Sequence, residues 1–289
     1  MPTGRTLRCV LKELVRRRRK VDWAPEIIIA GRAVQWCQCH AADLHKQFFP
    51  CLTALTNAAS FETGPVAPGE LVALFGTNLG PQQGVSFRAN AQSPYPSQLA
   101  DVQLTFGGIP APLMWVQAAQ INAVAPWSLT PGRTTLVCVS YENANGNCLS
   151  LPVAQAAPAV FTVDGTYAAA LNQDGSINSL NNPAAMGSIV VVWATGLGPI
   201  TPSQADGSLV APPLPDNILQ AGVTGTYQLG IPFPITSNVV FDVTYAGPAP
   251  YMVAGVSQIN FQVGSFPSNG MIYVTLPSSK SPPFALYTQ

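Results

Sequence analysis

An internal repeat constrains the fold of this chain more than any other feature of its sequence. The segment Gly69–Pro81 (GELVALFGTNLGP) aligns without a gap with Gly187–Pro199 (GSIVVVWATGLGP). Two further pairs of motifs follow in the same order: Ala111-Pro112 with Ala249-Pro250, and Gln120–Asn122 with Gln258–Asn260. Ordered blocks that recur together indicate two tandem copies of one structural unit. The interval between the blocks is longer in the second copy, which predicts an insertion around Ala211–Pro234.

The substitutions inside the repeat are those that one shared backbone would tolerate. Asn78 aligns with Gly196, and these two residue types most readily adopt a left-handed backbone. We therefore predict a positive φ at both positions. Phe75 aligns with Trp193, which predicts a large apolar side chain in the core of each copy.

From Thr53 onward, the sequence alternates apolar and polar residues in short runs. Such runs, separated by Gly, Asn and Asp turns, are typical of a β-sandwich or barrel. The predicted strands are Leu71–Phe75, Val102–Phe106, Thr134–Tyr141, Ile189–Trp193, Val239–Tyr245, Ile259–Val263 and Met271–Leu276. The 28 Pro and 24 Gly residues break helices. No apolar stretch reaches the about 18 residues that a transmembrane helix needs.

Several of these motifs resemble those of a known family. The motif Gly76–Gly80 (GTNLG), followed by a strand that ends in Phe106–Ala111 (FGGIPA), is similar to IPT/TIG immunoglobulin-like domains. Five motifs in order resemble the uncharacterised C-terminal domain family of large secreted acidobacterial proteins: Asn57–Phe61, Val66–Glu70, Gln120–Asn122, Ala170–Gly175 and Ala194–Pro199. The resemblance covers nearly all of 53–289 and implies tandem immunoglobulin-like sandwiches in a secreted protein, with no established activity. Such domains usually end long chains with a signal peptide, which this chain does not show.

We therefore expect an all-β fold with two tandem immunoglobulin-like β-sandwich domains, 53–160 and 161–289, preceded by a poorly structured basic extension, 1–52. Residues 1–50 hold ten of the thirteen Lys and Arg against four acids, a net charge of +6, whereas the remainder has three basic residues against nine acids. So abrupt a shift in charge marks a boundary. The apolar linker near Pro158–Asp164 is expected to pack and to hold the two domains at a fixed angle.

Three interpretations of the extension stay open. The first is a basic arm that binds nucleic acid or acidic lipid. The second is a segment that is disordered or that precedes the true start of the protein. The third interpretation is a zinc knuckle, although the ligand spacing is not that of a standard finger. Its candidate ligands are Cys37, Cys39, His40, His45 and Cys51.

The composition of the sandwich region argues against several kinds of chemistry. Both His residues, His40 and His45, precede it, so no imidazole is available there to activate a Ser or Cys nucleophile. Its nine acidic residues are scattered singly, which argues against a site with paired carboxylates. A nucleotide-binding glycine loop leads into a helix, and no glycine-rich segment here is followed by a helical pattern. Its three basic residues cannot make several contacts to nucleic-acid phosphates. We expect no enzyme, no catalytic or metal-ligating residues, no cofactor and no nucleic-acid partner.

Cys138 and Cys148 are predicted to form a disulfide. Cys138 lies in the predicted strand Thr134–Tyr141, and Cys148 opens the run Cys148–Pro152. A hairpin centred on Asn143 places the two residues opposite each other, within the distance that a disulfide bridges. The bond would form in the oxidising compartment that a secreted protein enters.

Two other groups of residues are candidates for a ligand site. Asp174 and Asp206, each followed by Gly, either supply oxygen ligands to calcium or form hairpin turns. Trp115 and Trp127 lie near predicted loops and are candidate contacts for a carbohydrate, or they pack in a core or between the domains. The other aromatic residues considered are Tyr141, Tyr167, Trp193, Tyr227 and Tyr251.

Two hypotheses for the function remain. The preferred one is a non-catalytic structural or adhesion module at the cell surface or outside the cell, whose partners are extracellular polymers or neighbouring proteins of unknown identity. The alternative is a carbohydrate-binding accessory module that uses exposed aromatic side chains, Trp115 and Trp127. Exposed aromatic rings on one face would favour the alternative, and buried ones the preferred hypothesis.

Overall fold

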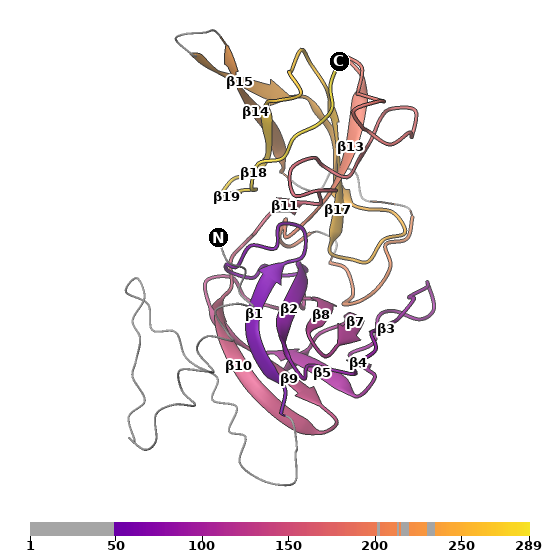
Figure 1. Ribbon diagram of the computed structural model, residues 1–289, viewed down its shortest axis with the longest axis vertical. Coiled ribbons are helices and arrows are strands. Elements are labelled where there is room, and N and C mark those ends of the chain that lie inside the picture. The colour runs from indigo at the N-terminus through magenta and orange to yellow at the C-terminus, as the bar shows by residue number, and fades with distance from the viewer. Residues whose placement is uncertain (1–48, 201–202, 213, 215–219, 230–234) are drawn as a thin grey trace, which may run out of the picture. The chain divides into compact units, whose positions relative to one another are not determined.

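The structure is a computed structural model, and it describes residues 49–200, 203–212, 214, 220–229 and 235–289. These residues all belong to one compact unit, Cys39–Gln289. The basic extension falls almost wholly outside the described residues, and with it the basic-arm and zinc-knuckle hypotheses, except that Cys51 is buried in the first strand. Every regular element that the structure describes is a β-strand, and the strands pair antiparallel in four sheets (Figure 1). Within this part of the chain, no helix could span a membrane.

The first two sheets come from residues 51–152. One has the strand order β1-β2-β8-β7-β3, with β1 at Cys51–Asn57, β2 at Leu71–Thr77, β8 at Gln120–Val124, β7 at Leu113–Gln117 and β3 at Val85–Ser86. The other has the order β10-β9-β5-β4 with β6 beside β5, where β10 is Ala144–Pro152, β9 Thr134–Tyr141, β5 Val102–Phe106, β4 Gln98–Leu99 and β6 Ile109–Pro110. Alternate side chains of both sheets fill one core, in which Leu74, Phe106 and Ile121 are fully buried.

The other two sheets come from residues 159–280. One has the order β11-β13-β17-β16 with β12 beside β13, where β11 is Ala159–Val160, β13 Ile189–Thr195, β17 Val256–Gln262, β16 Val243–Pro248 and β12 Ala170–Leu171. The last has the order β15-β14-β18-β19, with β15 at Ile235–Phe241, β14 at Gly222–Leu229, β18 at Met271–Leu276 and β19 at Ser279–Lys280. Val190, Phe261 and Phe284 are buried in the core between these sheets.

The strand orders of the two sandwiches match. The path β1-β2-β8-β7 corresponds to β11-β13-β17-β16, and β10-β9-β5 with β6 beside it corresponds to β19-β18-β14 with β15 beside it. The fold is therefore two tandem immunoglobulin-like β-sandwiches, as the sequence repeat predicts. The repeat also predicts the backbone correctly, since φ is 55° at Asn78 and 74° at Gly196.

Two details of the prediction are wrong. Val239–Tyr245 is not one strand, because β15 ends at Phe241 and β16 begins at Val243 in a different sheet. The chain passes from one sheet to the other at Asp242, and the alternation of apolar and polar residues continues through this point. The sequence pattern therefore does not reveal the change of sheet. The prediction of a core aromatic side chain in each copy is also wrong: Phe75 is half-buried against Phe61, outside the core of the first sandwich, and Trp193 is half-buried between the two sandwiches. Its face of β13 is covered by the first sandwich, which a pattern within one strand cannot reveal.

Cys138 and Cys148 are joined by a disulfide across the β9–β10 hairpin. The hairpin turns at Glu142 and Asn143, which have φ values of 49° and 63°. A bulge between Asn145 and Cys148 then shifts the register, so that Cys148 faces Cys138. The sequence prediction placed the centre of the hairpin close to this turn but did not include the bulge.

Candidate functional site

The candidate site lies where the two sandwiches meet. An apolar cluster here draws Leu71 and Val124 from the first sandwich and Ala249, Val253 and Val256 from the second, all of them buried. We call it the junction cluster. Partly buried neighbours complete it: Ala58, Tyr95, Met114, Phe161, Trp193 and Leu209. Because both sandwiches contribute, separating them would expose the cluster to water.

The hydroxyl of Thr195 bridges the sandwiches beside this cluster. Its Oγ1 accepts a hydrogen bond from the backbone N–H of Leu71 at 2.8 Å and donates to the carbonyl oxygen of Gly255 at 2.9 Å. The side chain is fully buried. Its counterpart in the repeat, Thr77, is exposed. The same position of the repeat thus lies on the surface in the first copy and is buried between the sandwiches in the second.

Backbone segments of the two copies are joined by further hydrogen bonds. Asn57 Nδ2 donates to the carbonyl oxygen of Ala157 in the linker at 3.0 Å, and the N–H of Ala157 donates to the carbonyl oxygen of Gly196 at 2.7 Å. The N–H of Trp127 donates to Asp206 Oδ1 at 2.9 Å. These bonds give partners to backbone groups of Ala157, Gly196 and Trp127 where the two copies meet.

Both of the predicted Asp-Gly segments form turns, and their carboxylates accept hydrogen bonds from the protein. Asp174 Oδ1 accepts from the N–H of Ser176 at 3.0 Å, within the second sandwich. Asp206 Oδ1 instead accepts from Trp127 in the first sandwich. The Asp206 turn therefore belongs to the junction, whereas the Asp174 turn is local. The turn interpretation is therefore confirmed at both positions, and calcium binding is an alternative that nothing in the structure tests.

Neither of the two predicted ligand-contact Trp residues is exposed. Trp127 is half-buried and packs against the core of the second sandwich, and its buried Nε1 has no hydrogen-bond partner among the described residues. Trp115 is half-buried on β7, with its indole against Gly84. Trp127 thus takes the role of a contact between sandwiches that the sequence analysis weighed against carbohydrate binding. A ligand at either ring stays a prediction.

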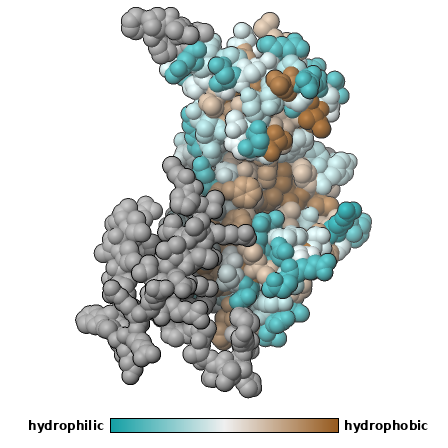
Figure 2. Space-filling view, viewed as in Figure 1, coloured by the Kyte–Doolittle hydropathy of each residue, from teal (hydrophilic) through white to brown (hydrophobic). Residues whose placement is uncertain are grey.

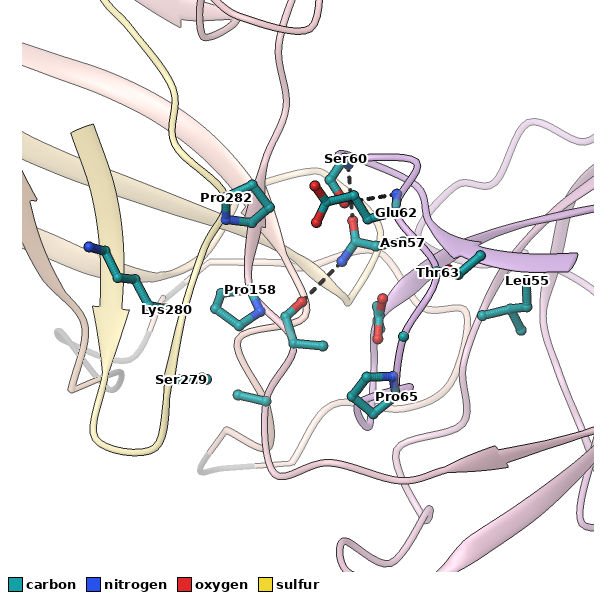
Figure 3. Close-up of a pocket in the computed structure, with 14 residues that line it drawn as sticks. Leu55, Asn57, Ser60, Glu62, Thr63, Pro65, Pro158, Ser279, Lys280 and Pro282 are labelled. Carbon is teal, nitrogen blue, oxygen red and sulfur yellow. Dashed lines mark hydrogen bonds between the residues drawn. The ribbon is translucent and has the colours of Figure 1, made fainter. Parts of the chain in front are cut away.

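A pocket of about 260 Å³ opens at the edge of the junction (Figure 3). The first sandwich contributes Asn57, Glu62 and Glu70 to its lining, and the second contributes Ser279 and Pro282. Lys280 also borders the pocket, but Figure 3 shows its side chain pointing away. Its ammonium group lies 3.4 Å from the centre of the Tyr273 ring. The other ionisable residues of the lining are Glu62, which is exposed, and Glu70, which is buried.

Glu70 is the chemically unusual residue of the pocket, and the sequence analysis missed it. Its side chain is buried, its Oε2 accepts a hydrogen bond from the N–H of Ala67 at 2.7 Å, and it bonds to the side chain of Asn57. Burial raises the pKa of Glu70 to about 8, against the lowering effect of these two bonds. The carboxyl closes the turn before β2 and supports the Asn57 side chain that reaches the linker.

The repeat held a signal for this role. Glu70 aligns with Ser188, which closes the corresponding turn by donating from its Oγ to the carbonyl oxygen of Ala185 at 2.6 Å. A polar side chain directly before a buried strand in both copies indicates a turn-closing residue. The sequence alone does not show that only Glu70 is buried.

No protein-family model and no curated protein matches the chain. Among solved structures, SGBP-B from a complex xyloglucan utilization locus in Bacteroides uniformis is 13% identical, with a TM-score of 0.24, over 83% of this chain and 49% of that one. The full extracellular region of plexin A4 (domains 1 to 8) is 11% identical, with a TM-score of 0.27, over 83% of this chain and 18% of that one. The chain thus spans about half of the first protein and less than a fifth of the second.

Proposed function

We propose that the chain is a non-catalytic structural or adhesion module that holds two immunoglobulin-like sandwiches in one arrangement and presents their outer surfaces. The observation that carries this proposal is the junction. It combines a shared apolar cluster with the buried Thr195 bridge between Leu71 and Gly255. An interface built like a domain core resists reorientation, which suits a part that sets spacing between attached surfaces.

The loops of the second sandwich supply surface suited to broad contact. Four large apolar side chains in this region are exposed by two thirds or more: Val163 by 67%, Ile177 by 69%, Leu180 by 75% and Met186 by 69%. Figure 2 shows apolar patches set among hydrophilic residues on the visible face. Exposed apolar groups of this kind favour weak, extended contact with polymers or neighbouring proteins, and such contact gains strength by repetition.

The same proposal includes the compartment, the family and the domain limits. The Cys138–Cys148 disulfide supports an extracellular or cell-surface location, because such bonds persist in oxidising compartments. The sequence motifs support membership of the acidobacterial C-terminal family. Strand pairing supports a change of domain between Pro152, where β10 ends, and Ala159, which pairs with β13.

The proposal is tested with the full chain on a glycan array, on immobilised insoluble polysaccharides, and on a panel of ester, peptide and glycoside substrates. We expect no turnover, and binding to extended polymers that weakens in an Ile177→Ser, Leu180→Ser double variant. Leu136→Ser is the matched control, because Leu136 is 53% exposed on β9 of the first sandwich. Turnover that one point mutation abolishes would contradict the proposal. So would micromolar binding of one soluble oligosaccharide that is lost in Trp115→Ala or Trp127→Ala.

One observation favours the carbohydrate-binding alternative at a different residue. Tyr251 is 74% exposed and has a φ of 62°, an unusual backbone for a bulky residue, and the neighbouring Met252 is 41% exposed. Strained, exposed aromatic residues occur at binding sites. A Tyr251→Ala variant that lost glycan binding while remaining folded would support the alternative.

A further inference from the structure

Among the described strands, β15 has a neighbour on one side only. It stands at the end of its sheet, and all seven of its residues, Ile235–Phe241 (ITSNVVF), pair with β14 without a register shift. The strand has no charged residue and no Pro. Figure 1 shows it on the outer side of β14. An uncovered edge of this length presents a row of backbone N–H and C=O groups to any strand that can pair with it.

The other sheet edges of the described chain are blocked by recognised means. Six of the other strands with a neighbour on one side only have just two residues each: β3, β4, β6, β11, β12 and β19. The edge strands β1, β10 and β16 each carry a register shift. In addition, β10 ends at Pro152 and β16 at Pro248, neither of which has an N–H to donate. Against these edges, β15 stands out as the one left able to pair.

The free edge is what the longer second copy adds to the fold. The counterpart of β15 in the first sandwich is β6, which has two residues. The second copy lengthens this hairpin to eight residues in β14 and seven in β15. Because the first sandwich folds with a two-residue strand at this position, the seven residues of β15 are more than the fold itself requires.

The composition of the hairpin favours a copy of the same chain as the partner. From Asn217 to Phe241 the sequence contains no charged residue, so two copies do not repel each other. An antiparallel pair around a two-fold axis brings a strand against itself. Full overlap of the seven residues centres the axis on Asn238, placing Thr236 opposite Val240 and Ser237 opposite Val239. The pair of Thr236 with Val240 joins two β-branched residues, which is favourable across strands, and the two Asn238 amides can hydrogen-bond.

We propose that two copies of this chain associate through antiparallel pairing of their β15 strands, centred on Asn238. Side chains on this strand are free to take part, since Thr236 and Asn238 are exposed and Val240 is 81% exposed. The inference deepens the proposed function and rests on it, because it names a partner for a module that works through its surface. One strand pair is smaller than a typical stable interface, so the dimer is reversible, with a Kd between about 10 µM and 1 mM.

The test is analytical ultracentrifugation of the full chain from about 10 µM to 1 mM. The wild-type chain sediments increasingly as a dimer as its concentration rises. Asn238→Lys and Asn238→Glu each remain monomeric, because the axis places like charges opposite each other. An equimolar mixture of the two variants dimerises again. Leu136→Lys, on an internal strand of the first sandwich, dimerises like the wild type.

Three results would overturn the inference: a wild-type chain that is monomeric at about 1 mM, an Asn238→Lys variant that dimerises as well as the wild type, or mixed Lys and Glu variants that do not recover the dimer. Polymer binding by the monomeric Asn238→Lys variant is measured in parallel. A chain that never dimerises but binds extended polymers refutes this inference and leaves the proposed function standing.

Discussion

Replacing Thr195 with Val removes the hydroxyl that bridges the two sandwiches while keeping the shape of the side chain. The variant leaves two backbone groups without their partner, the buried N–H of Leu71 and the partly buried carbonyl oxygen of Gly255. A buried polar group left unsatisfied costs about 1–3 kcal/mol. The added methyl group recovers up to about 0.8 kcal/mol by burial. The full cost applies to the N–H of Leu71 and a part of it to the carbonyl oxygen of Gly255, so we expect Thr195→Val to lower the free energy of unfolding by about 1–4 kcal/mol.

Urea denaturation followed by far-ultraviolet circular dichroism measures this loss. The repeat provides the control: Thr77→Val makes the same substitution at the aligned position, where the side chain is exposed. The control is expected to change the free energy of unfolding by less than about 0.5 kcal/mol, as surface substitutions usually do. Equal effects of the two variants would refute the role assigned to the Thr195 hydroxyl.

Three further variants test other parts of the structure. The pKa of Glu70, about 8 in the folded chain against an ordinary 4.5, means that the folded state retains a proton between these pH values and the unfolded state does not. The free energy of unfolding therefore falls as pH rises through this window, and Glu70→Gln, but not Glu62→Gln, flattens the slope in pH-dependent denaturation. Replacing both Cys138 and Cys148 with Ser removes the disulfide, whose two residues are separated by 10 positions, and is expected to lower the free energy of unfolding by about 2–3 kcal/mol in the same assay. A variant as stable as the oxidised wild type would contradict this expectation. Gly196→Ala lowers the midpoint of thermal unfolding strongly, because φ is 74° and a Cβ would collide with the linker carbonyl; an unchanged midpoint would contradict this packing.

The sequence predicts the fold well because the repeat and the alternation are local signals. The strands Val102–Phe106, Thr134–Tyr141 and Met271–Leu276 have the predicted bounds. The positive φ at Asn78 and Gly196 follows from one pair of aligned residues. Each of these features depends on neighbours in the chain or on the aligned copy, so the sequence contains what is needed to infer them.

The junction could not be predicted in the same way. Thr77 and Thr195 occupy the same position of the repeat, yet one is exposed and the other joins the two sandwiches. The burial of Glu70 likewise depends on how the turn before β2 is covered. The difference between the two threonines arises from the contact of Thr195 with Leu71, which are 124 positions apart in the chain, and no periodic pattern encodes such a contact.

The central claim, that the two sandwiches form one rigid unit, is tested most directly by residual dipolar couplings of backbone amides in the weakly aligned full chain. Alignment tensors are fitted separately to the strands of residues 51–152 and to those of 159–280. We expect the two tensors to agree in magnitude and rhombicity, because the junction cluster and the Thr195 bridge prevent independent motion. A markedly smaller tensor for one sandwich would show that it reorients relative to the other and would contradict the claim.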